Sequence, residues 1–337
     1  LAGTSLESLA EIVHIYCTSE DVNNLAYALM IRGAVHEVWL PAFEALIGDL
    51  EALARETAEV PMLSRTHGQA ATPTTLGKEM AVFAHRLGRQ ARRIPANQML
   101  GKINGATGTF GAHLAAVPEA DWLEISQSFV EGLGLTWNPL TTQIESHDWQ
   151  AEIYADIARY NRVLHNLCTD VWSYISMGYF AQVRGQGTVG SSTMPHKVNP
   201  IRFENAEANL EVSNALLDVL ASTLVTSRLQ RDLTDSSMQR NIGTAFGHSL
   251  LAISNVAKGL QRLDVRPSPG PGRHANPPPR PGAQRSCARP RGAGGPSGGA
   301  RGRITRLRGS LSGRGAADAA GPGARRVGVW ARGALGR

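Results

Sequence analysis

A stripe of apolar side chains along residues 149–174 constrains the fold more than any other part of this 337-residue chain. Its members recur every three or four residues over about 26 positions, which is typical of a helix packed against other long helices. Residues 210–224 and 242–260 repeat the pattern, and few segments alternate as strands do. The sequence therefore predicts an all-α bundle of long helices. The first stripe consists of Trp149, Ile153, Ile157, Tyr160, Leu164, Leu167, Val171 and Tyr174.

The first half of the chain predicts two more long helices. One runs from Asn24 to about Thr57 and is bent or broken near Pro41, because proline lacks an N–H donor. The next begins at Thr72-Pro73, read as a cap followed by a first-turn proline, and runs to about Ile94. The segment between them places His67 on a turn.

The charge of the chain is divided unevenly. Residues 266–337 hold 15 Arg, no Lys and one Asp, a net +14, together with 17 Gly and 10 Pro. The preceding 265 residues hold 19 basic and 27 acidic residues, a net −8, although the whole chain is +6. Residues 1–265 therefore read as a mildly acidic globular protein. Residues 266–337 are expected to be disordered, because so few apolar residues cannot bury a core.

Cysteine usage and hydropathy narrow the class of protein. Cys17, Cys168 and Cys287 are odd in number and far apart, which supports neither a disulfide framework nor a zinc site. His165 lies three residues before Cys168, but two ligands do not make a metal site, and core packing is the better interpretation. No apolar run approaches the roughly 20 residues of a membrane span, and no cleavable leader opens the chain. A cytoplasmic location is expected.

The segment 190–205 concentrates the groups best suited to chemistry. Ser191 and Ser192 offer adjacent hydroxyls, Lys197 a cation and Asn199 an amide, all after a polar run punctuated by glycine. A mobile loop leading into a helix after Pro200 is expected. Such groups can handle a carboxylate beside a reacting carbon. The competing interpretation is a surface Ser/Thr loop before a helix.

This segment resembles the signature loop of the aspartase/fumarase superfamily, Ser-Ser-x-Met-Pro-x-Lys-x-Asn. His196 before Lys197, followed by Pro-Ile-Arg-Phe-Glu-Asn205, is similar to the bacterial adenylosuccinate lyase family. Ser-Arg-Thr-His67-Gly-Gln resembles a second signature of the same family. The resemblance spans roughly residues 12–265 in at least four separated signatures, and it implies the aspartase/fumarase type of long-helix bundle.

The resemblance implies β-elimination of fumarate from adenylosuccinate to give AMP, and from the succinyl-aminoimidazole-carboxamide ribotide of purine biosynthesis. It makes Ser191 the base and His67 the acid that protonates the departing nitrogen. A serine hydroxyl is a weak base, so Ser191 must be held as an alkoxide when the loop closes. No metal or organic cofactor is implied. The substrate-binding residues implied are Thr18, Ser19, Gln143, Ser192, Lys197, Val198, Asn199, Asn205, Arg231, Ser236 and Arg240.

Each substrate-binding segment also has a structural interpretation. Thr18 or Ser19 can simply cap a helix whose first turn is acidic. Ser236 and Gln239 form a capping-box pattern. A pair of arginines is more often solvated surface, although two of them beside exposed helix amides would cradle a phosphate or dicarboxylate. His147, after Gln143, could be a surface residue of the first helical turn.

The glycine-rich stretch 101–108 fits neither a Walker loop nor a dinucleotide fingerprint. It leaves Lys102 and Asn104 as weaker site candidates.

Three regions are expected. Residues 1–20 would be the remnant of an N-terminal domain, 21–265 the central helical bundle, and 266–337 the disordered tail. The family has a C-terminal helical domain where this tail lies, and an Arg-rich, Lys-free composition is what out-of-frame translation of GC-rich DNA would give. The tail is therefore interpreted as a frameshift product. An RNA-binding arginine/glycine segment is the alternative.

The family's sites draw on several subunits, so a homotetramer with shared active sites is implied. The partner is a small nucleotide substrate, and neither a membrane nor a nucleic acid is expected as a partner. Fumarase or argininosuccinate lyase would place other residues at 196 and 231–236. An inactive fragment, or a chain that binds RNA through its basic tail, is the alternative from a different class.

Overall fold

The computed structural model describes residues 2–183 and 197–266. Its long helices are α1 (Ser19–Gly33), α2 (Leu40–Glu56), α3 (Leu76–Ala91), α6 (Asp148–Ser176), α7 (Ile201–Leu224) and α9 (Ile242–Leu260). The short helices are η1 (Glu7–Ile12), η2 (Ala34–Trp39), η3 (Ile94–Ala96), α4 (Gly111–Ala116), α5 (Trp122–Gly132) and α8 (Thr234–Gln239). The strands are β1 (Pro61–Thr66), β2 (Gln69–Thr75), β3 (Leu100–Gly101), β4 (Thr136–Trp137), β5 (Phe180–Gln182) and β6 (Leu263–Val265).

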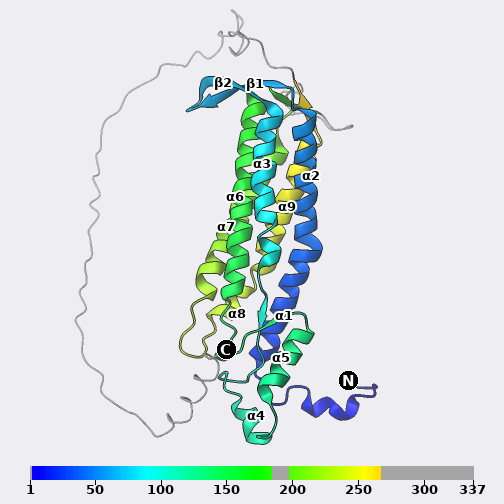
Figure 1. Ribbon diagram of the computed structural model, residues 1–337, viewed down its shortest axis with the longest axis vertical. Helices are drawn as coiled ribbons and strands as arrows, with labels where there is room; N and C mark the ends of the chain where they lie inside the picture. The colour runs from blue at the N-terminus through cyan, green and yellow to red at the C-terminus, as the bar shows by residue number, and fades with distance from the viewer. Residues whose placement is uncertain (1, 184–196, 267–337) are drawn as a thin grey trace, which may run out of the picture. The chain divides into compact units, whose positions relative to one another are not determined.

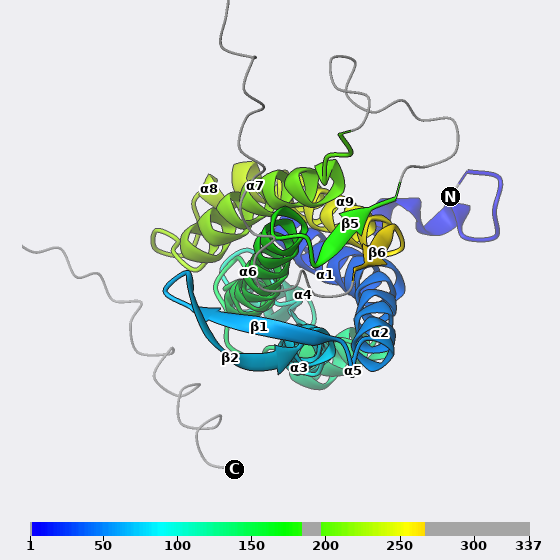
Figure 2. The same cartoon turned by 90° about the horizontal axis from the view of Figure 1, so that it is seen from above.

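Five long helices close a ring around one apolar core. Contacts run from α2 to α3, to α6, to α7, to α9 and back to α2, and the view along the bundle in Figure 2 shows this order. The predicted stripe is buried on α6, where Ile153, Ile157, Leu164 and Leu167 have no exposed surface. Helix α6 covers the whole predicted stripe. The predicted all-α bundle is confirmed.

The first long helix is continuous but irregular before Pro41. Helices α1 and α2 are joined by η2, which is a π-helical stretch, so one rod runs from Ser19 to Glu56. π-Helical turns occur mostly as short insertions within α-helices, and this one ends shortly before Pro41, which cannot donate a backbone hydrogen bond. The widened turn keeps Trp39 buried, where its Nε1 donates to Ser249 Oγ on α9 at 2.8 Å.

The predicted helix start at Thr72-Pro73 is wrong. Residues 61–75 form an antiparallel hairpin, with Pro73 opposite Leu63 in its register, and α3 begins only at Leu76. Thr75 is the N-cap, accepting a hydrogen bond from Lys78 N at 3.2 Å. Proline is tolerated in an edge strand that needs no N–H at that position. A cap-like pair of residues was therefore mistaken for a helix boundary.

The bundle has two ends that matter for function (Figure 1). The hairpin end carries β1, β2, β5 and β6, and the α8 end carries α8 and the starts of α1 and α6. Helix α6 connects them with 29 residues, or about 43 Å at 1.5 Å per residue. Residues at opposite ends of one chain cannot contact the same small molecule.

A close approach at Gly77 provides a test of the packing. A Cβ there would lie 2.3 Å from Ala54 O and 2.6 Å from Ala58 N. Because these are backbone atoms, Gly77→Ala should lower the free energy of unfolding by about 1–3 kcal/mol. Gly48 lies on the exposed side of α2, and nothing lies within 4 Å of a Cβ placed there. Gly48→Ala should therefore raise the free energy of unfolding by about 0.5–1 kcal/mol. Denaturant unfolding of both variants checks this, and equal effects would contradict the described packing.

Candidate functional site

His67 occupies the tip of the β1–β2 hairpin. It and Gly68 have φ of 53° and 75°, the left-handed values that a two-residue hairpin turn requires. Arg65 Nη1 donates to Gly68 O at 3.2 Å and ties the tip to its own strand. The His67 side chain is exposed, so its imidazole is available to a partner molecule. The predicted turn is confirmed, in the form of a hairpin.

The signature loop is only partly described. Ser191 and Ser192 lie outside the described residues, together with His196. Lys197 and Asn199 are exposed, and Val198 is half-buried, in the irregular stretch before α7. The predicted catalytic base therefore has no described position, while the residues that follow it lead directly into α7.

Asn205, near the start of α7, is held by two other amides. Its Oδ1 accepts hydrogen bonds from Asn255 Nδ2 at 2.8 Å and from Asn209 Nδ2 at 3.2 Å. Arg202 Nη1 fixes Asn255 in turn at 2.9 Å. The Asn205 oxygen is thus occupied, and its exposed amide nitrogen is the group left to donate to a ligand.

The start of α7 belongs to the hairpin end. Asn255, its hydrogen-bond partner, lies in the last turns of α9, just before β6. Strand β6 pairs with β5, and Tyr179 beside β5 accepts a hydrogen bond from Leu63 N of β1 at 3.3 Å. His67, Lys197, Val198, Asn199 and Asn205 therefore share the hairpin end.

Thr18 and Ser19 begin α1 at the opposite end. Thr18 is the N-cap, and its N–H donates to Asp21 Oδ2 at 2.9 Å, which confirms the capping interpretation. Ser19 is exposed in the first turn. Capping does not exclude substrate contact, because both residues stand at the positive end of a 15-residue helix.

Gln143 lies in the loop that precedes α6. Its Nε2 donates to Ala106 O at 2.8 Å, and its backbone N–H donates to Gln230 O at 3.3 Å. The second bond brings Gln143 directly beside the segment that carries Arg231. Two predicted substrate-binding segments are therefore joined through the backbone.

Arg231 stands between two carboxylates. Its Nη1 lies 2.9 Å from Glu20 Oε1 on α1 and 3.8 Å from Asp235 Oδ2 on α8, and 18% of its side chain is exposed. The guanidinium is therefore anchored on its inner side and reaches solvent on the other. An anchored arginine of this kind is suited to binding a phosphate or carboxylate.

The predicted capping box of Ser236 and Gln239 is wrong. Helix α8 begins at Thr234, so Ser236 lies inside its first turn, and the N-cap is Leu233. Instead, Asp235 Oδ1 accepts the Ser236 N–H at 2.7 Å. The Ser236 N–H is thus bound by the side chain of the preceding residue.

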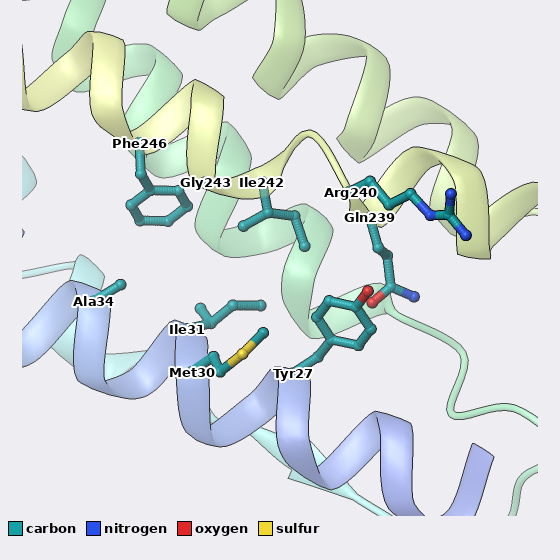
Figure 3. A pocket seen from close by; sticks show the side chains of 9 residues that line it. All are labelled: Tyr27, Met30, Ile31, Ala34, Gln239, Arg240, Ile242, Gly243 and Phe246. Atoms are coloured by element: carbon teal, nitrogen blue, oxygen red, sulfur yellow. The ribbon is translucent and has the colours of Figure 1, made fainter. Parts of the chain in front are cut away.

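Arg240 ends α8 beside a pocket of about 410 Å³ between α1 and α9. Figure 3 shows Ile31, Ile242 and Phe246 on its apolar side and the polar ends of Tyr27 and Gln239 beside one another. The exposed Arg240 guanidinium points away from the apolar side chains. This end of the chain therefore combines an exposed cation with an apolar hollow.

Asp235 is charged although it is buried. Burial raises its pKa, but a hydrogen bond from His147, the charge of Arg231 and the Ser236 N–H together hold the pKa below its usual value. A depressed carboxyl pKa stabilises the folded state at pH values above the unfolded pKa, and this contribution is lost as the pH falls through the folded pKa. Asp235 is thus a fixed negative charge at neutral pH.

The weaker candidates in the glycine-rich stretch are structural. Lys102 is fully buried, with Nζ 2.8 Å from Asp21 Oδ1, and burial lowers its pKa while Asp21 opposes that shift. Asn104 is also buried, and its backbone N–H donates to the same Asp21 oxygen at 3.0 Å. Neither side chain can reach a ligand. The surface interpretation of His147 is also wrong, since it is 1% exposed and caps α6.

Three interior residues of this end were not predicted. Glu20 and Asp235 hold Arg231, and Gln150 holds His147 from one turn inside α6. Gln150 and Tyr154 are polar residues beside the apolar stripe of a buried helix, which is the sequence signal that could have identified them. The Glu20–Arg231 and His147–Asp235 contacts join distant segments and leave no local signal.

The predicted site residues fall into two groups in one chain. The hairpin group contains His67, Lys197, Val198, Asn199 and Asn205, and the α8-end group contains Thr18, Ser19, Gln143, Arg231, Ser236 and Arg240. The length of α6, about 43 Å, separates the two ends. The two groups therefore cannot contact one small molecule within a single chain.

Residues 2–183 and 197–266 offer neither a metal site nor a membrane span. This part of the chain has no group of three or more His, Cys, Asp or Glu placed to hold a metal ion. Cys168 is buried in the core, as predicted, and burial raises its pKa. None of the described helices is both long and apolar enough to cross a bilayer.

Comparison with known proteins identifies the family. The family described as Lyase matches residues 2–212, and the one described as Adenylosuccinate lyase C-terminal matches 227–269. Adenylosuccinate lyase of Escherichia coli (strain K12) is 52% identical over 260 residues, covering 77% of this chain and 57% of that protein. Adenylosuccinate lyase of Haemophilus influenzae is 48% identical, with the same coverage of each chain.

The fold has a counterpart among solved structures. The fumarate lyase from Mesorhizobium sp. BNC1 matches with a TM-score of 0.65 at 21% identity, covering 76% of this chain and 57% of that one. The chain thus spans less than three fifths of the relatives it matches. It belongs to the lyase family of the aspartase/fumarase superfamily, and within it to the adenylosuccinate lyases.

Proposed function

We propose that the assembled protein cleaves adenylosuccinate to AMP and fumarate, and cleaves the succinyl-aminoimidazole-carboxamide ribotide of purine biosynthesis in the same way. The observation that carries the proposal is the 52% identity to an adenylosuccinate lyase over 77% of this chain. The geometry supports it, because the chain presents an exposed imidazole at one end and two arginines at the other.

The proposed reaction divides between two side chains. Ser191, as an alkoxide, removes the proton from the carbon next to the succinyl carboxylate, and His67 protonates the nitrogen as the carbon–nitrogen bond breaks. Lys197 and Asn199 stabilise the carboxylate on which negative charge accumulates. The carbon–carbon double bond of fumarate forms from the electrons of the broken C–H bond. The remaining predicted residues bind the nucleotide.

The same proposal includes a cytoplasmic homotetramer. Several apolar side chains on the outside of the bundle are solvent-exposed in the single chain, as expected of a surface that binds other copies. They are Trp172 on α6, Val212 and Val219 on α7, and Leu251 on α9. Association through these helices would bring the hairpin group and the α8-end group of different chains together.

The three predicted regions remain proposals. Residues 267–337 lie outside the described part of the chain, so the frameshift origin of the tail is tested on DNA. Reading the coding sequence in the other frames should give a helical continuation, and its absence in every frame would contradict the idea. RNA binding through the tail is tested by deleting 266–337 and measuring the salt dependence of RNA affinity.

The activity is tested on the complete 337-residue chain. Purified protein should release fumarate from adenylosuccinate in a stoichiometric ratio with AMP, and should leave argininosuccinate intact. If fumarate were released from argininosuccinate instead, the chain would have the activity of a different member of the superfamily. An absence of turnover with both substrates, in a folded and oligomeric preparation, would support the inactive-fragment alternative.

A further inference from the structure

A row of buried polar side chains runs from the second turn of α6 to Arg231. Tyr154 O–H donates to Gln150 Oε1 at 3.0 Å, and Gln150 Nε2 lies 3.3 Å from His147 Nδ1. His147 Nε2 lies 3.5 Å from Asp235 Oδ2, which is 3.8 Å from Arg231 Nη1. We propose that this Tyr154–Gln150–His147–Asp235 relay positions Arg231 and Ser236 for nucleotide binding. The inference rests on the proposed function.

The direction of the relay follows from its donors. Burial raises the pKa of Tyr154, so its hydroxyl keeps its proton and donates it to the oxygen of Gln150. The Gln150 amide then turns its nitrogen toward His147, and an NH2 group can only donate. Nδ1 of His147 must therefore be the acceptor. This fixes the ring proton on Nε2, which faces Asp235.

Gln239 completes the surroundings of the imidazole. It is 3% exposed, its Nε2 lies 3.4 Å from His147 Nε2, and its Oε1 has no hydrogen-bond partner. Because both facing nitrogens would be donors, exchanging the amide's oxygen and nitrogen gives His147 a second acceptor. The proton on His147 Nε2 then faces two acceptors, Asp235 Oδ2 and the Gln239 oxygen.

Asp235 accepts a hydrogen bond on one oxygen only, and its other oxygen makes longer electrostatic contacts with His147 at 3.5 Å and Arg231 at 3.8 Å. Oδ2 faces His147, and Oδ1 accepts the Ser236 N–H at 2.7 Å. One carboxylate therefore connects the start of α6, the Arg231 segment and the first turn of α8. Asparagine at this position could still accept the Ser236 N–H, but it would remove the carboxylate charge that faces His147 and Arg231. The relay is a positioning device rather than a catalytic one, because none of its members is exposed.

The backbone of His147 indicates that its place is fixed. It has φ of 62°, which is costly for a residue with a Cβ, and it is 1% exposed. Its N–H is held by Glu145 Oε2 at 2.9 Å, which also accepts Trp149 Nε1 at 2.9 Å. The imidazole is thus fixed on both its backbone and its ring side.

The test compares two tyrosines of α6. Tyr154→Phe removes the first donor of the relay, whereas Tyr160→Phe removes a buried hydroxyl that has no hydrogen-bond partner. We expect KM for adenylosuccinate to rise about 2- to 10-fold in Tyr154→Phe. Asp235→Asn should raise KM about 10- to 100-fold, because the carboxylate charge facing His147 and Arg231 is lost. In both variants kcat should change less than KM, and Tyr160→Phe should match the wild type.

Hydrogen–deuterium exchange of the peptide covering 228–240 provides a second readout that needs no turnover. Exchange should rise in Tyr154→Phe and Asp235→Asn but not in Tyr160→Phe. Higher exchange with an unchanged KM would reduce the relay to structural support and overturn the inference. If the wild-type protein releases no fumarate, the proposed function is wrong, and the relay is then tested by exchange alone. Unchanged exchange in both relay variants would overturn the relay whether or not the wild type is active.

Discussion

His67→Asn should lower kcat for fumarate release by about 10²- to 10⁴-fold, the usual contribution of a general acid. Asparagine is preferred to alanine here because His67 has a left-handed φ of 53° and precedes Gly68. Asn-Gly is a favoured pair for such a hairpin turn, so the β1–β2 hairpin should be preserved. The loss would then report on the missing imidazole. Steady-state fumarate release measures it.

Two controls separate chemistry from folding in this experiment. His36→Ala changes another exposed histidine, in η2, and should leave kcat as it is in the wild type. Thermal unfolding of His67→Asn should match the wild type, because the replaced side chain is exposed. Turnover retained in His67→Asn would remove this residue from the proposed acid role.

Lys102→Met should lower the free energy of unfolding by about 3–5 kcal/mol, the cost of leaving one partner of a buried ion pair uncompensated. Lys102 Nζ lies 2.8 Å from Asp21 Oδ1, and neither side chain has exposed surface. The same Asp21 accepts the backbone N–H groups of Thr18, Asn104 and Gly105. Loss of the cation therefore weakens the start of α1 and the loop after β3 together.

A matched surface pair supplies the control. Arg162 pairs with Asp218 between α6 and α7, with about half of each side chain exposed. Arg162→Met should cost less than about 1 kcal/mol, as exposed ion pairs do. Denaturant unfolding measures the free energy of unfolding of both variants, and the comparison holds if their m-values are equal. Equal losses would mean that the Asp21–Lys102 pair is not buried in solution as described.

The long helices were predictable because their signal is repeated many times. The stripe from Trp149 to Tyr174 samples one face of α6 over about seven turns, and α6 was found at Asp148–Ser176. The β1–β2 hairpin was missed because its signal is a single pair, Thr72-Pro73, that fits a helix cap equally well. A short element cannot be predicted reliably when the only sequence pattern that marks it is equally typical of another structure.

The candidate site divides in the same way. The sequence singled out His67, Arg231 and Arg240 from motifs that are local in the chain. It could not identify Asp235 and His147 as partners, because they lie 88 positions apart in the sequence and only the tertiary fold brings them together. It also could not show that His67 and Arg231 lie at opposite ends of α6. That separation follows from the path of the helices.

Mixing two inactive variants tests the central claim, that a working site combines the hairpin end of one chain with the α8 end of another. One variant carries His67→Asn, and the other carries Arg231→Ala with Arg240→Ala. In randomly mixed oligomers, about a quarter of the sites would receive both intact groups from different chains. We predict recovery of about a quarter of the wild-type kcat/KM. Mixed oligomers that form but stay as inactive as their parents would contradict the account.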